Sequence, residues 1–449
     1  MYGMKQRETD LTEGRVDRQL IAYAIPMVAG NLLQACYSMA DMMLAGHFIT
    51  GGRGISAINN SSQIMLLLTN IIIGITMGGN VVVGQYFGKK DEQGRREAAG
   101  TLLCLAVVCG ILIAGGLYAV SQPLLRLLGA PAMEEALAYL RICCFGVPFI
   151  FLYNAIAAIL RAMGNSKTPL RFVAASTITN IILDILMMGV MQWGTAGAAL
   201  ATVLSQVLCC TLASGYLLSR KDLFRLDRAH VCIVHRQLKL ILRVGIPSAL
   251  QMTIAGFSWL VVTFLINQYG VDVSAGNGVS VKIKDFSHLF ITAMSSASSS
   301  MIAQTLGAGK YDRAKEVLYA AIGISVKMAL CIICIVQLTA PLLVRIFTPD
   351  PAVAEAAVRN LRIEIFGEVF YAVFLNYHAL AIGAGHTIFA MGSSFVNCIV
   401  VRVVLATLFQ HYFGIVGVYV ACMIAPSSSI PLGWLYTRSN VWRKTLVSS

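Results

Sequence analysis

Charged residues are scarce in this chain of 449 residues. Asp, Glu, Lys and Arg make up 12% of the sequence, and 57% of the residues are hydrophobic. Soluble domains carry about 25% charged residues, so this scarcity excludes an ordinary soluble protein. The apolar residues come in long runs, such as the stretch from Ile64 to Gly84, and a helix needs about 20 of them to cross a bilayer. Runs of about ten residues with alternating hydrophobicity, typical of outer-membrane strands, are also missing, which leaves transmembrane helices.

The sequence also lacks the common motifs of catalysis. It contains no H-E-x-x-H, no G-x-S-x-G and no P-loop pattern, so we set a membrane-embedded enzyme aside. We expect no cofactor and no metal other than a coupling Na⁺. The twelve cysteines lie mostly inside apolar runs, which indicates packing rather than redox chemistry. The polar first twenty residues do not resemble a cleavable signal, so the first apolar run is interpreted as an uncleaved helix.

Twelve apolar segments follow one another along the chain. We therefore predict an all-α membrane protein with about twelve transmembrane helices. The segments lie at about 17–45, 54–84, 97–120, 136–162, 168–190, 196–219, 239–268, 276–306, 314–337, 356–383, 388–411 and 416–436.

The basic residues are distributed unevenly between the connections. Most Lys and Arg residues fall in the terminal segments and in every second connection, including the basic stretch at 220–238. Because cytoplasmic loops of membrane proteins are enriched in Lys and Arg, this bias predicts that both termini are cytoplasmic. It also explains the net charge of +13 as a consequence of topology, and we predict no nucleic-acid partner.

The two halves of the sequence repeat each other. GQYFGKKDEQGRREAA after the second segment returns as AQTLGAGKYDRAKEVL after the eighth, and GTAGAALATV returns as GIVGVYVACM. Six segments separate the copies, so both halves have the same orientation and are related by a pseudo-two-fold axis along the membrane normal. We predict two six-helix lobes, at 1–219 and 239–449, joined by a cytoplasmic connector at 220–238.

Polar residues within the N-terminal segments are the first functional candidates, because a charge inside the bilayer is costly unless it is paired, protonated or hydrated. Asp41 lies late in the first segment and Asp184 late in the fifth, one turn after Asn180. The sixth segment begins on the side of the membrane where the first and fifth segments end, and Thr202 lies about six residues into it. Two carboxylates with neutral oxygens suit a hard monovalent cation or, through mutual repulsion, a proton. These four residues are therefore predicted to form a cation-coupling site.

The first segment also carries a polar stripe and a proline. Gln34, Tyr37 and Asp41 follow helical i, i+3, i+7 spacing and line one face. Pro26 matches Pro247 in the second half, and a proline inside a helix frees backbone groups and bends it. We predict that Pro26 is a hinge.

Charges within the C-terminal segments form a second candidate set. They either take part in transport or neutralise one another as Lys–Asp or Arg–Glu pairs. The set comprises Lys282, Lys284 and Asp285 in the eighth segment, Glu364 and Glu368 in the tenth, and Arg402 in the eleventh, and we name Lys282, Asp285, Glu368 and Arg402 as the possible polar site.

Several of these stretches resemble the multidrug and toxic compound extrusion (MATE) transporters. The resemblance rests on IPMVAGNLLQACYSMADMMLAG, VVVGQYFGKKDEQGRREAA, FLYNAIAAILRAMGNSKTPLR, NIILDILMMG and GTAGAALATVLSQ. It spans about 17–437. It implies a two-lobed bundle of twelve helices that exports mostly cationic, amphipathic compounds in exchange for Na⁺ or H⁺.

The resemblance also implies roles for individual residues. The family's cation site corresponds to Asp41, Asn180, Asp184 and Thr202, with a backbone carbonyl from Ala198; its cavity-lining positions correspond to Gln34, Tyr37 and Asn154, and its bend to Pro26. One branch of the family carries acids in helices seven and ten. The seventh segment here has none, so the comparison favours coupling through the N-terminal half.

From these observations we expect a monomeric, multi-pass protein of the cell or inner membrane that works as a secondary antiporter. A lipid-linked saccharide flippase of the same superfamily is the alternative. It would require a more basic cavity, for which Lys282, Lys284 and Arg402 are available. The substrate and the choice between H⁺ and Na⁺ are left open.

Overall fold

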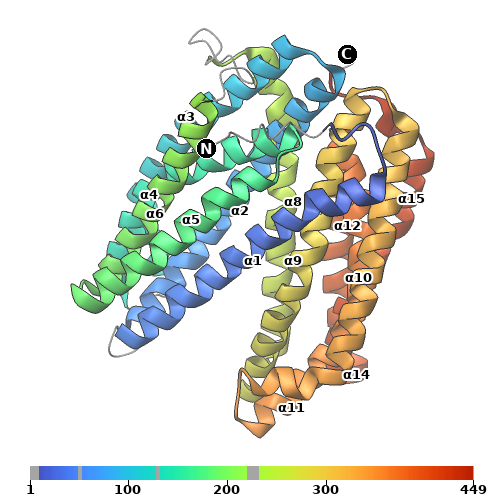
Figure 1. The fold of residues 1–449 in the computed structure, drawn as a ribbon. Coiled ribbons are helices and arrows are strands. Elements are labelled where there is room, and N and C mark those ends of the chain that lie inside the picture. Colours follow the sequence, from blue (N-terminus) through green and yellow to red (C-terminus); the bar gives the residue numbers. More distant parts are fainter. Residues whose placement is uncertain (1–9, 49–52, 128–131, 220–231, 448–449) are drawn as a thin grey trace. The chain divides into compact units, whose positions relative to one another are not determined.

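A computed structural model describes residues 10–48, 53–127, 132–219 and 232–447. Within these ranges the regular structure is helical and contains no strand (Figure 1). The chain divides into two compact units. The first contains Ala29–Gly245, and the second contains Asp10–Val28 together with Ile246–Ser449. Residues 220–231, which make up most of the connector predicted at 220–238, lie outside the described residues.

The first unit is built around α4 (Met133–Ala162), which packs against α2, α3 and α6. Such helices bury apolar faces on one another, so each long apolar run of the sequence becomes one helix of the bundle. The unit's other elements are the later part of α1 (Val16–Phe48), α2 (Arg53–Lys89), α3 (Glu92–Leu127), α5 (Lys167–Asp184), η1 (Ile185–Val190), α6 (Gly194–Ser219) and the start of α8 (His235–Asn267).

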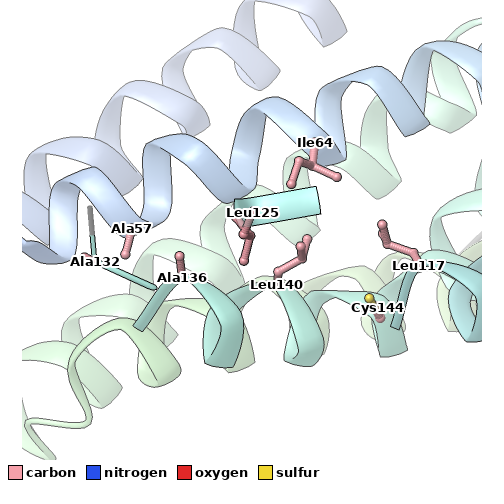
Figure 2. Packing of buried hydrophobic residues seen from close by; sticks show 8 residues of the cluster. All are labelled: Ala57, Ile64, Leu117, Leu125, Ala132, Ala136, Leu140 and Cys144. Atoms are coloured by element: carbon pink, nitrogen blue, oxygen red, sulfur yellow. The ribbon is translucent and has the colours of Figure 1, made fainter. Parts of the chain in front are cut away.

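Figure 2 shows how α2, α3 and α4 meet in this unit. Small and medium apolar side chains from the three helices interlock, so the helix backbones approach closely. The cluster contains Ala57 and Ile64 from α2, Leu117 and Leu125 from α3, and Ala132, Ala136, Leu140 and Cys144 at the start and along α4.

The second unit is built around α9 (Val271–Gly307), which packs against α10, α11 and α12. Apolar residues of α8 pack against α14, among them Val262 against the cluster of Val418 and Tyr419. The unit's other elements are α10 (Tyr311–Arg345), α11 (Pro351–Glu364), α12 (Gly367–Ala384), α13 (Thr387–Phe395), η3 (Val396–Val403), α14 (Val404–Ile424), η4 (Ala425–Ser428), α15 (Ser429–Arg438) and η5 (Val441–Arg443).

The twelve predicted segments are all found as helical rods. Nine stretches of the described chain are long and apolar enough to cross a membrane. One of them, Thr387–Arg438, contains 52 residues and is interrupted at Gly414, whose φ of 61° is not helical, so it supplies two rods. The α11–α12 pair forms one rod bent by 48°, and α9 is a 37-residue helix that is simply more polar. The predicted all-α class is therefore confirmed.

The first helix of each sequence half begins against residues of the opposite half. Residues 10–28 belong to the second unit, where the Leu11 amide donates to Gln304 Oε1 at 3.3 Å. Arg313 donates to the Leu11, Glu13 and Gly14 carbonyls and to Gln19. In the first unit, the start of α8 makes the equivalent contact, since Gln237 Nε2 donates to Tyr86 Oη at 3.1 Å and to Glu97 at 3.2 Å.

A glycine pair allows α2 and α8 to touch within the first unit. A Cβ added to Gly78 would lie 2.2 Å from the Ile241 carbonyl oxygen and 2.9 Å from the Gly245 nitrogen. A Cβ added to Gly245 would lie 2.9 Å from the Ile75 Cα. The two helices are therefore in backbone contact, which only small residues permit.

Candidate functional site

The C-terminal end of α5 holds two buried polar side chains in the first unit. Asn180 is 1% exposed and Asp184 is 0% exposed, and both lie on one side of the helix because they are a turn apart. Directly after Asp184 the helix widens into the π-helical segment η1. π-helical turns inside α-helices occur frequently at functional sites. The helix geometry therefore changes next to the buried carboxylate.

Hydrogen bonds connect this region of α5 to α6 and α1. The Tyr37 hydroxyl on α1 lies 3.2 Å from Thr202 Oγ1 on α6. Ser205 Oγ donates to the Thr202 carbonyl at 2.8 Å, and Ser176 Oγ on α5 donates to the Ser205 carbonyl at 2.9 Å. Tyr37, Thr202 and the α5 segment before Asn180 thus belong to one polar network.

Ala198 anchors the apolar side of the same region. It is fully buried in a cluster with Ile58 of α2 and Met188 of η1, against which Leu44 of α1 packs. Tyr37 contacts Thr202 of α6, and Leu44 packs against the cluster that contains Ala198 of α6. The part of the α1 backbone between these two residues, which includes position 41, therefore runs along α6. The side chain of Asp41 lies outside the described residues, so its predicted role stays a prediction.

The remaining predicted residues of the N-terminal half lie apart from this network. Asn154 is half-buried and donates from Nδ2 to the Ile150 carbonyl of its own helix at 2.8 Å. Gln34 is exposed on α1. Pro26 is buried inside α1, in the part of the helix that belongs to the second unit. The hinge role of Pro26 stays a prediction.

The chemistry of the N-terminal group follows from its burial. A buried carboxylate is stable only when a cation, a proton or several hydrogen-bond donors compensate its charge. The amide nitrogen and oxygen of Asn180 are buried and have no hydrogen-bond partner within the described residues. The Asn180 amide oxygen and the Thr202 hydroxyl oxygen are ligands of the kind that hard cations prefer.

The C-terminal half holds a buried ion pair and a His–Glu contact at the break between α11 and α12. Lys284 on α9 forms an ion pair with Glu364, the last residue of α11, and their side chains are 6% and 3% exposed. His288 Nε2 lies 3.0 Å from Glu368 Oε1 at the start of α12. The two glutamates therefore flank the 48° bend, and each contacts α9.

The predicted pairing within this set is only partly what the structure shows. Lys284 pairs with Glu364 instead of the adjacent Asp285, because α11 faces it across the bundle. Arg402, in η3, stacks on Trp259 with its Cζ 4.8 Å from the ring centroid and forms no ion pair in the part of the chain that is described. Asp285 and Lys282 are exposed on α9, and Asp285 lies within electrostatic range of Glu368.

Three aromatic and amide residues of this region were missed by the sequence reasoning. Trp259 contacts both Arg402 and Lys284, whose Nζ lies 5.0 Å from the ring centroid. Tyr371 stacks on His288 at 4.3 Å, and Asn397 is 1% exposed in η3. The sequence signal for Asn397 is that it lies five residues before Arg402, as Asn180 lies four residues before Asp184.

These observations define a class: a multi-pass membrane protein with two repeated helical halves and buried polar residues within each bundle, as in secondary transporters. The MatE family model matches the chain twice, at residues 26–186 and 247–408. The protein belongs to the MatE family. The two matches correspond to the two sequence halves, which confirms the internal repeat. The family consists of transporters, so the chain is a transporter and not an enzyme.

Relatives and solved structures agree with this assignment. The chain is 27% identical to "Probable multidrug resistance protein YoeA" of Bacillus subtilis, covering 96% of this chain and 95% of the relative. It is 28% identical to "Probable multidrug resistance protein YpnP" of the same organism, covering 97% of both. A crystal structure of MATE in the straight conformation superposes with a TM-score of 0.92 at 22% identity, covering 99% of this chain and 100% of that one, which shows the shared fold.

Proposed function

We propose that the protein is a cation-coupled antiporter of the cell (inner) membrane that exports amphipathic, mostly cationic compounds in exchange for H⁺ or Na⁺. Both termini are cytoplasmic in this proposal, and the working unit is a monomer. The names of the relatives, which describe multidrug resistance proteins, support the substrate class. The residues of α5, α6 and α1 support the coupling.

The observation that carries the proposal is the fully buried carboxylate of Asp184 beside Asn180 and η1. A buried carboxylate requires that a cation, a proton or hydrogen-bond donors compensate its charge. Binding and release of the ion therefore change the stability of this part of the bundle. Thr202 and Tyr37, which hold α6 to α1 at 3.2 Å, transmit that change to the first helix.

Antiport requires that the ion and the substrate weaken each other's binding. When the carboxylates of Asp184 and Asp41 are ionised, the negative field attracts a cationic substrate. When H⁺ or Na⁺ neutralises them, that attraction is lost and the substrate is released. The carboxylates of Asp184 and Asp41 thus bind the coupling ion and the cationic substrate in turn. Exchange follows because the ion and the substrate compete for the same negative charges.

The test is efflux of a fluorescent organic cation from proteoliposomes under an imposed H⁺ or Na⁺ gradient. Wild type is compared with Asp184→Asn and Asp41→Asn, which remove charge at nearly constant volume. Glu355→Gln, on the exposed face of α11, is the matched control for loss of one carboxylate. We expect one gradient to drive transport in wild type and control, and neither to drive it in the two Asp variants.

Full gradient-driven efflux by Asp184→Asn would contradict the assignment of the coupling site. Absence of gradient-dependent movement in wild type would contradict antiport itself. In that case the flippase of the same superfamily becomes the better candidate, because Lys284 and Arg402 supply buried positive charge for an anionic lipid carrier.

A further inference from the structure

Arg402 is an unusual residue for the interior of a membrane bundle. Its side chain lies in η3 and the residue is 6% exposed. Nε and Nη1 are completely buried, and no hydrogen-bond acceptor or ion-pair partner meets them among the described residues. Taking such a charge out of water costs several kcal/mol when no counter-charge is present. Within the described residues, the Arg402 guanidinium is therefore a strong hydrogen-bond donor whose Nε and Nη1 have no acceptor.

The contact that Arg402 does make is insufficient to compensate it. The guanidinium lies 4.8 Å above the centroid of Trp259, and a cation–π contact is weaker than the cost of taking a charge out of water. The indole also faces Lys284, at 5.0 Å, so two cations share one ring. Stacking on the ring leaves the in-plane N–H groups of the guanidinium free for another partner.

The neighbouring carboxylates are engaged elsewhere. Glu364 is paired with Lys284, and Glu368 accepts from His288 at 3.0 Å. Neither lies within ion-pair distance of Arg402. The Oδ1 atom of Asn397, which is buried in the same segment η3, is also without a partner in the described structure. None of the described residues supplies an acceptor for Arg402 Nε and Nη1, which leaves these donors available to a ligand.

The internal repeat gives independent support. In the first unit, Asn180 and Asp184 precede the π-helical segment η1 and then α6. In the second unit, Asn397 and Arg402 lie in the π-helical segment η3, which precedes α14. In each half an asparagine therefore precedes one charged residue close to a π-helical segment, four residues before it in the α-helix α5 and five residues before it in the π-helix η3. The charge is negative in the first half and positive in the second.

We propose that Arg402 is the centre of an anion-binding site in the second unit, and that its ligand is the carboxylate group of an aromatic compound. The guanidinium matches a carboxylate with paired N–H donors. Two aromatic residues lie near the group: Trp259 stacks on it, and Tyr371 lies within electrostatic range of Arg402. Tyr371 also stacks on His288, whose side chain is 26% exposed.

This site goes beyond the proposed antiport. The coupling residues of the first unit attract cations, whereas Arg402 attracts an anion, so the protein would also accept compounds that carry a carboxylate. Equilibrium binding without any ion gradient tests the site. The result is therefore separate from the outcome of the gradient-driven efflux experiment.

The experiment titrates detergent-solubilised full-length protein with benzoate and, separately, with its neutral isostere benzamide, in a chloride-free sulfate buffer of constant ionic strength. Tryptophan emission is the readout, because Trp259 stacks on Arg402. We expect a saturable change with benzoate and none with benzamide. Trp259→Phe should remove the optical signal, and a benzoate-dependent rise in melting temperature should remain in that variant.

Arg402→Gln removes the charge and should abolish both the emission change and the melting shift. Arg402→Lys keeps the charge without the planar fork and should weaken benzoate binding at least tenfold. Arg345→Gln, at the exposed end of α10, is the control and should bind as wild type does. Because a buried unpaired charge is destabilising, Arg402→Gln should melt no lower than wild type in the absence of benzoate.

Equal responses to benzoate and benzamide in wild type would overturn the proposal, as would an unchanged benzoate response in Arg402→Gln. Chloride is the second probe. A saturable response to chloride that requires Arg402 and that benzoate does not reproduce would support the anion site and assign it to a halide in place of a carboxylate.

Discussion

The ion pair between Lys284 and Glu364 allows a quantitative test of whether the charges of the second unit stabilise the fold. Both side chains are more than nine-tenths buried. Replacing Glu364 by Leu leaves the Lys284 ammonium buried without an acceptor, and breaking a buried pair in this way costs about 3–5 kcal/mol. The ring of Trp259, 5.0 Å from Nζ, persists in the variant. We therefore expect a loss at the lower end of that range.

The double variant Lys284→Met, Glu364→Leu separates the pair's contribution from the cost of an orphaned charge. Because apolar residues of similar volume replace buried pairs with little loss, we expect the double variant to be close to wild type in stability. The surface pair of Arg96 and Glu92, with side chains 19% and 68% exposed, is the matched control. Glu92→Leu should cost less than about 1 kcal/mol.

The assay is equilibrium unfolding in mixed micelles, followed by tryptophan fluorescence, with transport measured on the same preparations. A Glu364→Leu variant within about 1 kcal/mol of wild type would refute the argument from burial. A double variant that is as stable as wild type but does not transport would show that the Lys284–Glu364 pair serves the transport cycle.

Two further predictions concern the packing of the helices. Gly78→Leu should abolish folding of the first unit or lower its melting temperature sharply, because the added Cβ would lie 2.2 Å from the Ile241 carbonyl oxygen. The measurement is thermal melting, and the control is Gly116→Leu, where an added Cβ meets open space. Arg313→Met removes the hydrogen bonds to the Leu11, Glu13 and Gly14 carbonyls and should speed tryptic cleavage after Arg15; an unchanged cleavage rate would contradict that anchoring role.

The helical rods were predictable from the sequence, because each rod must bury or present to lipid an unbroken apolar stretch. The segment predicted at 136–162, for example, corresponds to α4, Met133–Ala162. The boundary between the last two segments, predicted near residues 411–416, corresponds to the kink at Gly414. Local hydropathy and one glycine were sufficient in these places.

The bend between α11 and α12 was not predictable in the same way. The sequence indicated one segment at 356–383, whereas the structure bends by 48° between Glu364 and Gly367. A Cβ on Gly367 would lie 3.0 Å from the Met423 carbonyl oxygen, so α14 contacts the backbone at the bend. The cause is a tertiary contact with a helix more than fifty residues away in sequence, which no local pattern contains.

The partners of the buried charges were equally hidden. Sequence spacing placed Asp285 beside Lys284, but neighbouring residues on a helix point in different directions, and the Lys284 side chain reaches Glu364 on α11. For Asn180 and Asp184, in contrast, i, i+4 spacing correctly predicted a shared face, since both are buried at one end of α5. Contacts within one helix are thus accessible from sequence, and contacts between helices are not.

The difference between the halves bears on where an ion gradient is coupled to transport. In the second unit, Glu364 and Glu368 already contact Lys284 and His288. A cation that binds either glutamate must displace the existing partner, and most of its binding energy is lost in breaking that contact. In the first unit, Asp184 is fully buried one helical turn after Asn180. Because the glutamates of the second unit are already engaged, we expect the ion gradient to be coupled to transport in the N-terminal half.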